Sequence, residues 1–165
     1  MGTKYLYVFK AGDAKDRGVA DFSDLVHNSE LVKLILEKCF ELGIPAMMDH
    51  DLLDMTANIF YIDILTSISS YPGQDNILKG LTLMTCEGSG DVNLITALLG
   101  LNLENGLNES VKWYRDERGD QKIPRIQCRF GFRSHPDDVK KMQNTKWKQV
   151  IVDSVVEALR KFEEI

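Results

Sequence analysis

Cysteine side chains, which can attack substrates or bind zinc as thiolates, are few and scattered in this sequence. The three cysteines, Cys39, Cys86 and Cys128, are odd in number, far apart and without CxxC spacing. We therefore expect reduced, buried thiols rather than a disulfide framework or a cysteine-bound zinc. Cys128 precedes Arg129 on a predicted strand, so the two side chains point to opposite faces, and Cys128 is expected to be a core thiol rather than a nucleophile.

Histidine could serve as a metal ligand or a general base at three positions. His27 lies one turn along a predicted helix from Asp24, so the two side chains could share one pocket; the alternative is a histidine at the surface or the edge of the core. His50 and His135 stand beside turn-like residues and are expected to be solvated.

Two further segments contain residue types that could bind ligands. Residues 87–91, Glu-Gly-Ser-Gly-Asp, precede a predicted helix and could cradle a phosphate, but they lack the lysine and spacing of a P-loop, and a plain loop is expected. Trp113 and Tyr114 could stack on a sugar ring, although an aromatic pair in a strand is more often half buried.

The hydrophobic pattern indicates which elements must position these residues. Apolar, β-rich runs predict strands at 5–9, 44–48, 60–68, 81–85 and 126–130. Helical spacing predicts helices at 23–42 and 91–103, the second with Asp91 as N-cap, and a short helix at 51–58. An apolar stripe from 147 to 162 predicts a terminal helix that needs a sheet face to cover it.

This alternation of strands and helices is typical of the α/β class. We expect one domain over residues 1–165, three-layered, with a mostly parallel twisted sheet and helices on both faces. Ligands of such sheets bind at the carboxyl ends of the strands. The loops after Phe9, Ile68 and Phe130 are therefore the places to look for chemistry.

Charge and composition exclude several classes of function. The 165 residues have a formal net charge of -5 and 44% hydrophobic residues, which suits a globular protein and disfavours nucleic acid as a partner. We find neither a signal-peptide pattern nor a run of 18 apolar residues. The prediction is a cytoplasmic protein with no membrane partner.

The three loops and the start of the first long helix carry a resemblance to a known family. Residues 124–138, PRIQCRFGFRSHPDD, are similar to a segment Pro-Ala-Val-Leu-Val-Glu-x-Gly-Phe-x-Ser-Asn-Pro-x-Asp, and the positions in register are Pro124, Gly131, Phe132, Ser134, Pro136 and Asp138. Residues 9–12, the spacing of Asp24 and Asn28, and residues 62–68 match further motifs in the same order. The chain resembles the zinc-dependent N-acetylmuramoyl-L-alanine amidases of type 3 fold, which cut the bond between N-acetylmuramic acid and L-alanine in peptidoglycan.

The resemblance implies a zinc site with two histidines and a glutamate, and a second glutamate that moves protons. The corresponding positions here are Asp13, Asp24 and Ser69 for the ligands and Arg129 for the catalytic glutamate. A serine hydroxyl is a poor zinc ligand, and a guanidinium cannot accept a proton. We therefore expect no zinc, no other cofactor and no hydrolysis.

The same substitutions suggest a different use for the groove. The cation of Arg129 could replace the charge of the metal, so we predict a contact between Arg129 and Asp24 or Asp13. Asp13, Asp24, His27, Ser69 and Arg129 are the candidate ligand-binding residues of a catalytically inactive binding or regulatory module. An exposed Arg129 would suit an anionic or peptidoglycan-derived ligand, and a buried, neutralised one would suit a protein partner.

Other interpretations of the two aspartates stay open. Asp13 can be an ordinary turn residue, and Asp24 a first-turn carboxylate that complements the helix dipole. A hard-metal site built from Asp13, Asp24 and Ser69 is the third interpretation.

Two enzymatic alternatives also remain. The chain could be an active peptidoglycan hydrolase, an N-acetylmuramoyl-L-alanine amidase that binds zinc through relocated ligands, with His27 or Glu30 recruited from the helix. It could also be an unrelated hydrolase using Cys128 or Ser69, although neither has an obvious base nearby in the sequence.

Overall fold

The chain forms a mixed six-stranded sheet with four helices over the residues that the structure describes. This computed structural model describes residues 2–12, 24–49, 58–67, 80–85, 89–115, 123–132 and 135–165. The strands are β1 (Leu6–Ala11), β2 (Ala46–Met48), β3 (Ile59–Ser67), β4 (Leu81–Thr85), β5 (Val111–Arg115) and β6 (Arg125–Phe132). The helices are α1 (Asp24–Glu41), α2 (Gly90–Leu107), α3 (Pro136–Met142) and α4 (Thr145–Glu163).

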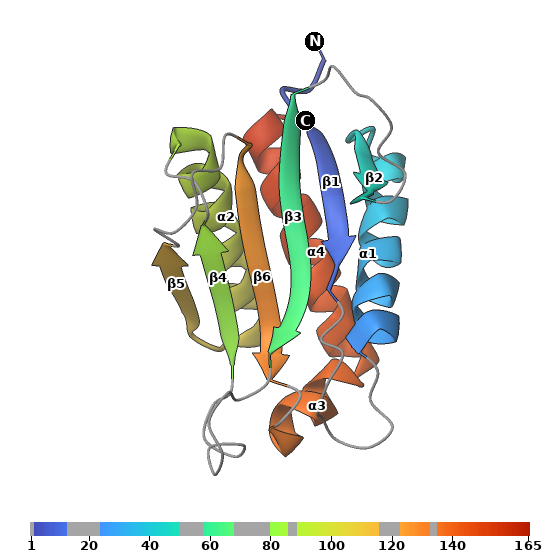
Figure 1. The fold of residues 1–165 in the computed structure, drawn as a ribbon, viewed down its shortest axis with the longest axis vertical. Helices are drawn as coiled ribbons and strands as arrows, with labels where there is room; N and C mark the ends of the chain where they lie inside the picture. The colour runs from blue at the N-terminus through green and yellow to red at the C-terminus, as the bar shows by residue number, and fades with distance from the viewer. Residues whose placement is uncertain are drawn as a thin grey trace.

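The sheet has the strand order β2-β1-β3-β6-β4-β5. Strands β2, β1, β3 and β6 run parallel to one another, whereas β4 and β5 run parallel to each other and antiparallel to β6 (Figure 1). The expected α/β class with a mostly parallel sheet is therefore confirmed. The carboxyl ends of β1, β3 and β6 meet at one end of the sheet, the lower end in Figure 1.

The three long helices α1, α2 and α4 lie together behind one face of the sheet, and α3 lies beyond the carboxyl end of β6 (Figure 1). The described residues place no helix over the opposite face. The helix expected at 51–58 lies outside the described residues, apart from Asn58, so helical cover of that second face stays a prediction.

Alternation along the strands separates the core from the opposite face of the sheet. Phe60, Ile62 and Ile64 of β3 are buried in the main hydrophobic cluster, together with residues of the three long helices. Cys128 of β6 belongs to the same cluster. The residues between them, such as Asp63 of β3, point to the other face, and Asp63 is buried there as well.

Local sequence explains where two of the helices begin. Ser89, not Asp91 as expected, is the N-cap of α2, and its hydroxyl accepts a hydrogen bond from Val92 N at 3.3 Å. Asn144 caps α4 in the same way by accepting from Trp147 N at 3.1 Å. The terminal helix expected from the apolar stripe is thereby confirmed as α4.

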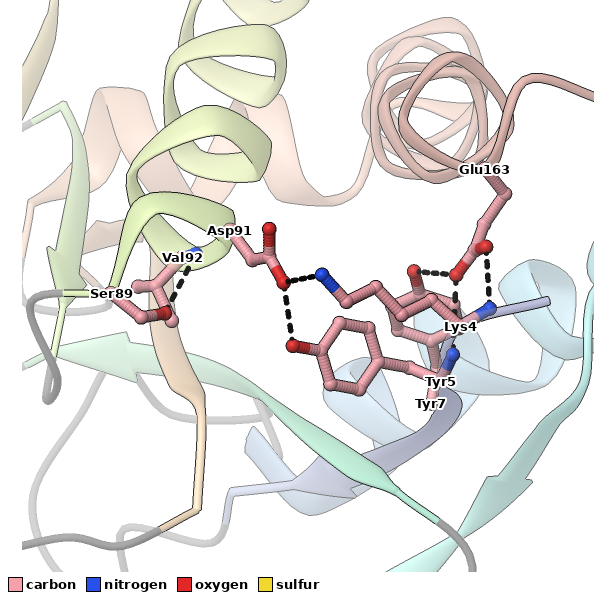
Figure 2. A network of polar contacts seen from close by, with 7 residues as sticks. All are labelled: Lys4, Tyr5, Tyr7, Ser89, Asp91, Val92 and Glu163. Atoms are coloured by element: carbon pink, nitrogen blue, oxygen red, sulfur yellow. Dashed lines mark hydrogen bonds and ion pairs between the residues drawn. The ribbon is translucent and has the colours of Figure 1, made fainter.

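A polar network ties the N-terminal segment to two helices at the end of the sheet away from the carboxyl ends of β1, β3 and β6 (Figure 2). Asp91 of α2 contacts Lys4 Nζ at 2.5 Å and accepts from the Tyr5 hydroxyl at 2.7 Å. Glu163 of α4 accepts from the Tyr7 hydroxyl at 2.6 Å and from Lys4 N at 2.7 Å. Burial raises the pKa of Tyr7, and the Glu163 carboxylate adds to the shift. Asp91 therefore works as an anchor for β1 rather than as a cap.

Among the described helices, none is long and apolar enough to span a membrane.

Candidate functional site

The sequence places its candidate site at the end of the sheet where β1, β3 and β6 terminate. Asp13 and Ser69 lie outside the described residues, as do His50 and Cys86. Asp24 begins α1, but its side chain is not among those described. The expected contact between Arg129 and either aspartate therefore stays a prediction.

The end of β1 is fixed to the first turn of α1 by a buried asparagine. Asn28 Nδ2 donates to the carbonyl oxygen of Gly12 at 2.9 Å, and Gly12 N donates to Ile64 O at 2.8 Å. A Cβ on Gly12 would collide with the side chain of Leu65, so only glycine fits there without a shift. These contacts set where Asp24, one turn before Asn28, stands relative to β1.

Arg129 lies on β6 near its carboxyl end, with Leu65 of β3 and Thr82 of β4 as its Cα partners on either side. Its side chain is partly exposed, on the face opposite the buried Cys128. Arg129 makes no ion pair with another residue in the described part of the chain. A guanidinium stays charged at any physiological pH, so this position offers a fixed cation.

Asp138 holds the segment that follows Arg129. Its Oδ2 accepts hydrogen bonds from Phe132 N and from Gly80 N, both at 2.9 Å, which joins α3 to the end of β6 and the start of β4. Gly131 has φ +134°, and a Cβ there would collide with Met142. The resemblance matched Gly131 and Asp138 by type, and the structure shows what each does.

His27 is buried, with 5% of its surface exposed, and its ring centroid lies 6.1 Å from that of Trp147 in α4. Burial lowers the pKa of His27 to about 4, with a further lowering from the charge of Lys148. Of the two positions in the alternative, the surface is excluded and the edge of the core is not: the ring is neutral near pH 7 and packs between α1 and α4. Glu30 forms an ion pair with Lys148, its Oε2 3.0 Å from Nζ, which occupies the carboxylate proposed as a relocated ligand.

His135 is not solvated as expected. It is 8% exposed and caps α3, with Nδ1 accepting from Asp137 N at 3.2 Å. The turn-like neighbours suggested exposure. The ring is instead covered, because it turns back to cap the first turn of α3.

The described cysteines are core thiols, as expected. Cys39 and Cys128 are free and buried. Burial raises the pKa of Cys39 to about 12 and raises that of Cys128 further, with a contribution from the charge of Asp63. Since the thiolate is the nucleophile, the burial of Cys128 weighs against the hydrolase that would use it.

The aromatic pair on β5 is half exposed. Trp113 is 47% and Tyr114 50% exposed, and Trp113 Nε1 donates to Thr85 Oγ1 at 3.4 Å. Trp113 and Val111 line a small cavity of about 240 Å³ together with α2, so their side chains are on the helical side of the sheet. Lys112 and Tyr114 are consequently on the opposite face.

A larger cavity of about 560 Å³ lies where α3 meets α4, and is lined by Asp137, Lys140, Lys141, Asn144 and Trp147. Arg129 is not among its lining residues. The groove expected between the loops at Asp13, Ser69 and Arg129 depends on residues outside the described ranges and stays a prediction.

Zinc is the metal that the resemblance implies for this end of the sheet. In the described part of the chain, no three His, Cys, Asp or Glu side chains come close enough to share a metal ion. The two described imidazoles are engaged elsewhere, His27 against Trp147 and His135 at the start of α3. At the positions that the resemblance assigns to the ligands and the catalytic glutamate, the sequence has two carboxylates, a hydroxyl and a guanidinium, a set without the nitrogen ligands that zinc prefers, so the absence of zinc stays a prediction.

The fold is that of the N-acetylmuramoyl-L-alanine amidases. The chain is similar to the amidase AmiC2 of Nostoc punctiforme, with a TM-score of 0.79 and 11% identity over 99% of this chain and 100% of that one. An N-acetylmuramoyl-L-alanine amidase from Clostridium difficile 630 has a TM-score of 0.79 and 12% identity over 99% and 98% of the two chains.

The CwlD amidase from Clostridioides difficile, solved in complex with the GerS lipoprotein, has a TM-score of 0.74 and 14% identity over 94% of this chain and 96% of that one. No family model matches the sequence. No curated protein matches it either. The TM-scores establish the shared fold. Because the identities are low, the activity has to be argued from the residues.

Proposed function

We propose that this chain is a catalytically inactive protein of the amidase fold that binds an anionic ligand through the end of the sheet where an amidase would cleave peptidoglycan. The observation that carries the proposal is the place of Arg129. It lies near the carboxyl end of β6, two residues before Gly131, where the resembled segment has its catalytic glutamate.

Arg129 is incompatible with the hydrolysis that the fold suggests. A general base must release and take up a proton near neutral pH, and a guanidinium does neither. A permanent cation would also repel a divalent metal ion bound next to it. One substitution therefore opposes both proton transfer and metal binding.

The same residue supports a binding role. Arg129 is partly exposed and has no acidic partner in the described part of the chain, which supports a role for its charge in binding a ligand. Guanidinium groups recognise carboxylates and phosphates through two parallel hydrogen bonds. An anionic ligand, for example one derived from peptidoglycan, matches this chemistry better than a neutral one.

Metal analysis and a digestion assay test the proposal together. Purified protein is incubated with zinc, freed of unbound ions and analysed for metal content, and is then mixed with peptidoglycan alongside a zinc amidase of the same fold. We expect no stoichiometric zinc and no released stem peptides. Arg129→Glu, which restores only the carboxylate, should be equally inactive because the imidazole ligands are still missing.

Stoichiometric zinc with release of stem peptides would overturn the proposal and favour the active hydrolase with relocated ligands. His27→Gln would then show whether that histidine takes part, since it should abolish zinc binding if it is a ligand.

A further inference from the structure

Register aligns two cations on the face of the sheet opposite the helices. Arg129 of β6 has Thr82 of β4 as its Cα partner, and Thr82 has Lys112 of β5 as its partner on the other side. The three residues therefore form one row across adjacent strands, and Thr82, which is 9% exposed, lies between the two cations.

All three side chains are on the face away from the helices. Leu83 is buried, and its Cδ1 lies 3.7 Å from the position of a Cβ on Gly100 of α2, so the helical side of β4 is the side of Leu83. Cys128 and Trp113 are the Cα partners of Leu83 and share that side. The residues next to them in the row, Thr82, Arg129 and Lys112, point the other way.

The two cations of the row have no counter-charge in the described part of the chain. Neither Arg129 nor Lys112 makes an ion pair with another described residue, although Lys112 is exposed and Arg129 partly so. Arg125, on the same face of β6, is by contrast neutralised by two hydrogen bonds to Asp63. Among the described residues, the two cations of the row thus stand without a counter-charge in a chain of net charge -5.

We infer that Arg129, Thr82 and Lys112 form a binding site for a small ligand that carries two oxyanion groups. The spacing of neighbouring strands puts the Arg129 and Lys112 backbones roughly 10 Å apart, two interstrand steps. Arg129 suits a bidentate carboxylate or phosphate, Lys112 acts as a point charge, and Thr82 can donate one hydrogen bond. This inference deepens the proposed function, because it assigns a ligand class to the same end of the sheet.

Calorimetric titration with two probes tests the site and distinguishes the source of the anion. Tripolyphosphate represents phosphate groups, and triglutamate represents peptide carboxylates. We expect one of them to bind, with an affinity that falls as salt is added. Arg129→Gln and Lys112→Gln should each weaken binding on the order of tenfold, and Thr82→Val about two- to fivefold.

Lys33→Gln is the matched control. Lys33 is also an exposed lysine, but it lies on α1, on the other side of the sheet (Figure 1). Its substitution should leave the affinity unchanged, and circular dichroism should show that all variants fold alike. Binding that responds equally to Lys33→Gln and Lys112→Gln, or no binding of either probe, would overturn the inference.

The two proposals fail in different ways. Zinc binding with peptidoglycan cleavage would overturn the proposal that the chain is catalytically inactive, whatever the result of the titrations. Absence of anion binding in a protein that also lacks zinc would overturn the site at Arg129 and Lys112 and the anionic ligand, and would leave the catalytic inactivity standing.

Discussion

Asp63 of β3 and Arg125 of β6 form a two-bond ion pair across neighbouring parallel strands. Arg125 Nε donates to Oδ2 at 2.6 Å, and Nη2 donates to Oδ1 at 2.9 Å. The guanidinium also lies over the ring of Tyr61, 5.4 Å from its centroid. Asp63 is buried between β3 and β6, the two central strands of the sheet. The ion pair with Arg125 compensates the cost of burying its carboxylate there.

Breaking this pair should destabilise the fold strongly. Asp63→Asn leaves a largely buried guanidinium without its counter-charge, and we expect a loss of about 2–4 kcal/mol in the free energy of unfolding. The double variant Asp63→Leu with Arg125→Met should recover much of that loss, because it removes both charges. Urea denaturation of the two variants measures the difference, and a stable Asp63→Asn protein would show that the pair is dispensable.

The asparagine that holds β1 to α1 gives a second prediction. Asn28→Ala removes the buried amide that donates to the Gly12 carbonyl oxygen, so the free energy of unfolding should fall by about 1–3 kcal/mol. Asn28→Asp replaces the donor with a carboxylate that faces a carbonyl oxygen. It should lower the free energy of unfolding more than Asn28→Ala does. Thermal unfolding compares them; equal stability of the alanine and aspartate variants would contradict a donor role for the amide.

Asp138 should be replaceable by asparagine but not by alanine. Both backbone N–H groups bond to one oxygen, Oδ2, and an asparagine can present its carbonyl oxygen at the same place. We expect Asp138→Ala to cost about 2–4 kcal/mol and Asp138→Asn clearly less. Chemical denaturation gives the two values, and an asparagine variant as unstable as the alanine variant would mean that the negative charge is what matters.

Local patterns were enough to predict the elements that bury a regular set of side chains. The strand expected at 60–68 is β3 (Ile59–Ser67), because Phe60, Ile62 and Ile64 alternate into the core. The hydrophobic pattern does not predict β5 (Val111–Arg115), because four of its five residues are exposed and no buried alternation marks it. Nor does it predict α3, whose seven residues hold only a short apolar pattern.

What the sequence could not reveal are relationships between distant residues. The partner of Asp63 stands 62 positions away, and nothing local indicates it. Ser89 and Asp91 are both good N-caps by type, and Asp91 serves Lys4 and Tyr5 instead because the N-terminal segment returns to α2. The row formed by Arg129, Thr82 and Lys112 likewise exists only because β4 lies between β6, to which it is antiparallel, and β5, to which it is parallel.

The buried His27 makes stability depend on pH in a defined window. Its pKa in the folded chain is about 4, below the ordinary value of 6.5 that the unfolded chain retains. Above pH 6.5 both states are neutral at this ring, so its contribution is complete. Between pH 6.5 and 4 only the unfolded state binds a proton, and stability falls by up to about 1.4 kcal/mol per pH unit, roughly 3 kcal/mol in all.

His27→Gln removes the titration and should flatten this part of the pH profile relative to the unaltered chain. His135→Asn, which keeps an N-capping side chain on α3, is the control for the loss of a histidine. Urea unfolding at intervals from pH 7 to pH 4 measures the slopes. If His27→Gln leaves the dependence of the free energy of unfolding on pH unchanged, the prediction is wrong. The His27 ring would then be protonated as easily in the folded chain as in the unfolded one.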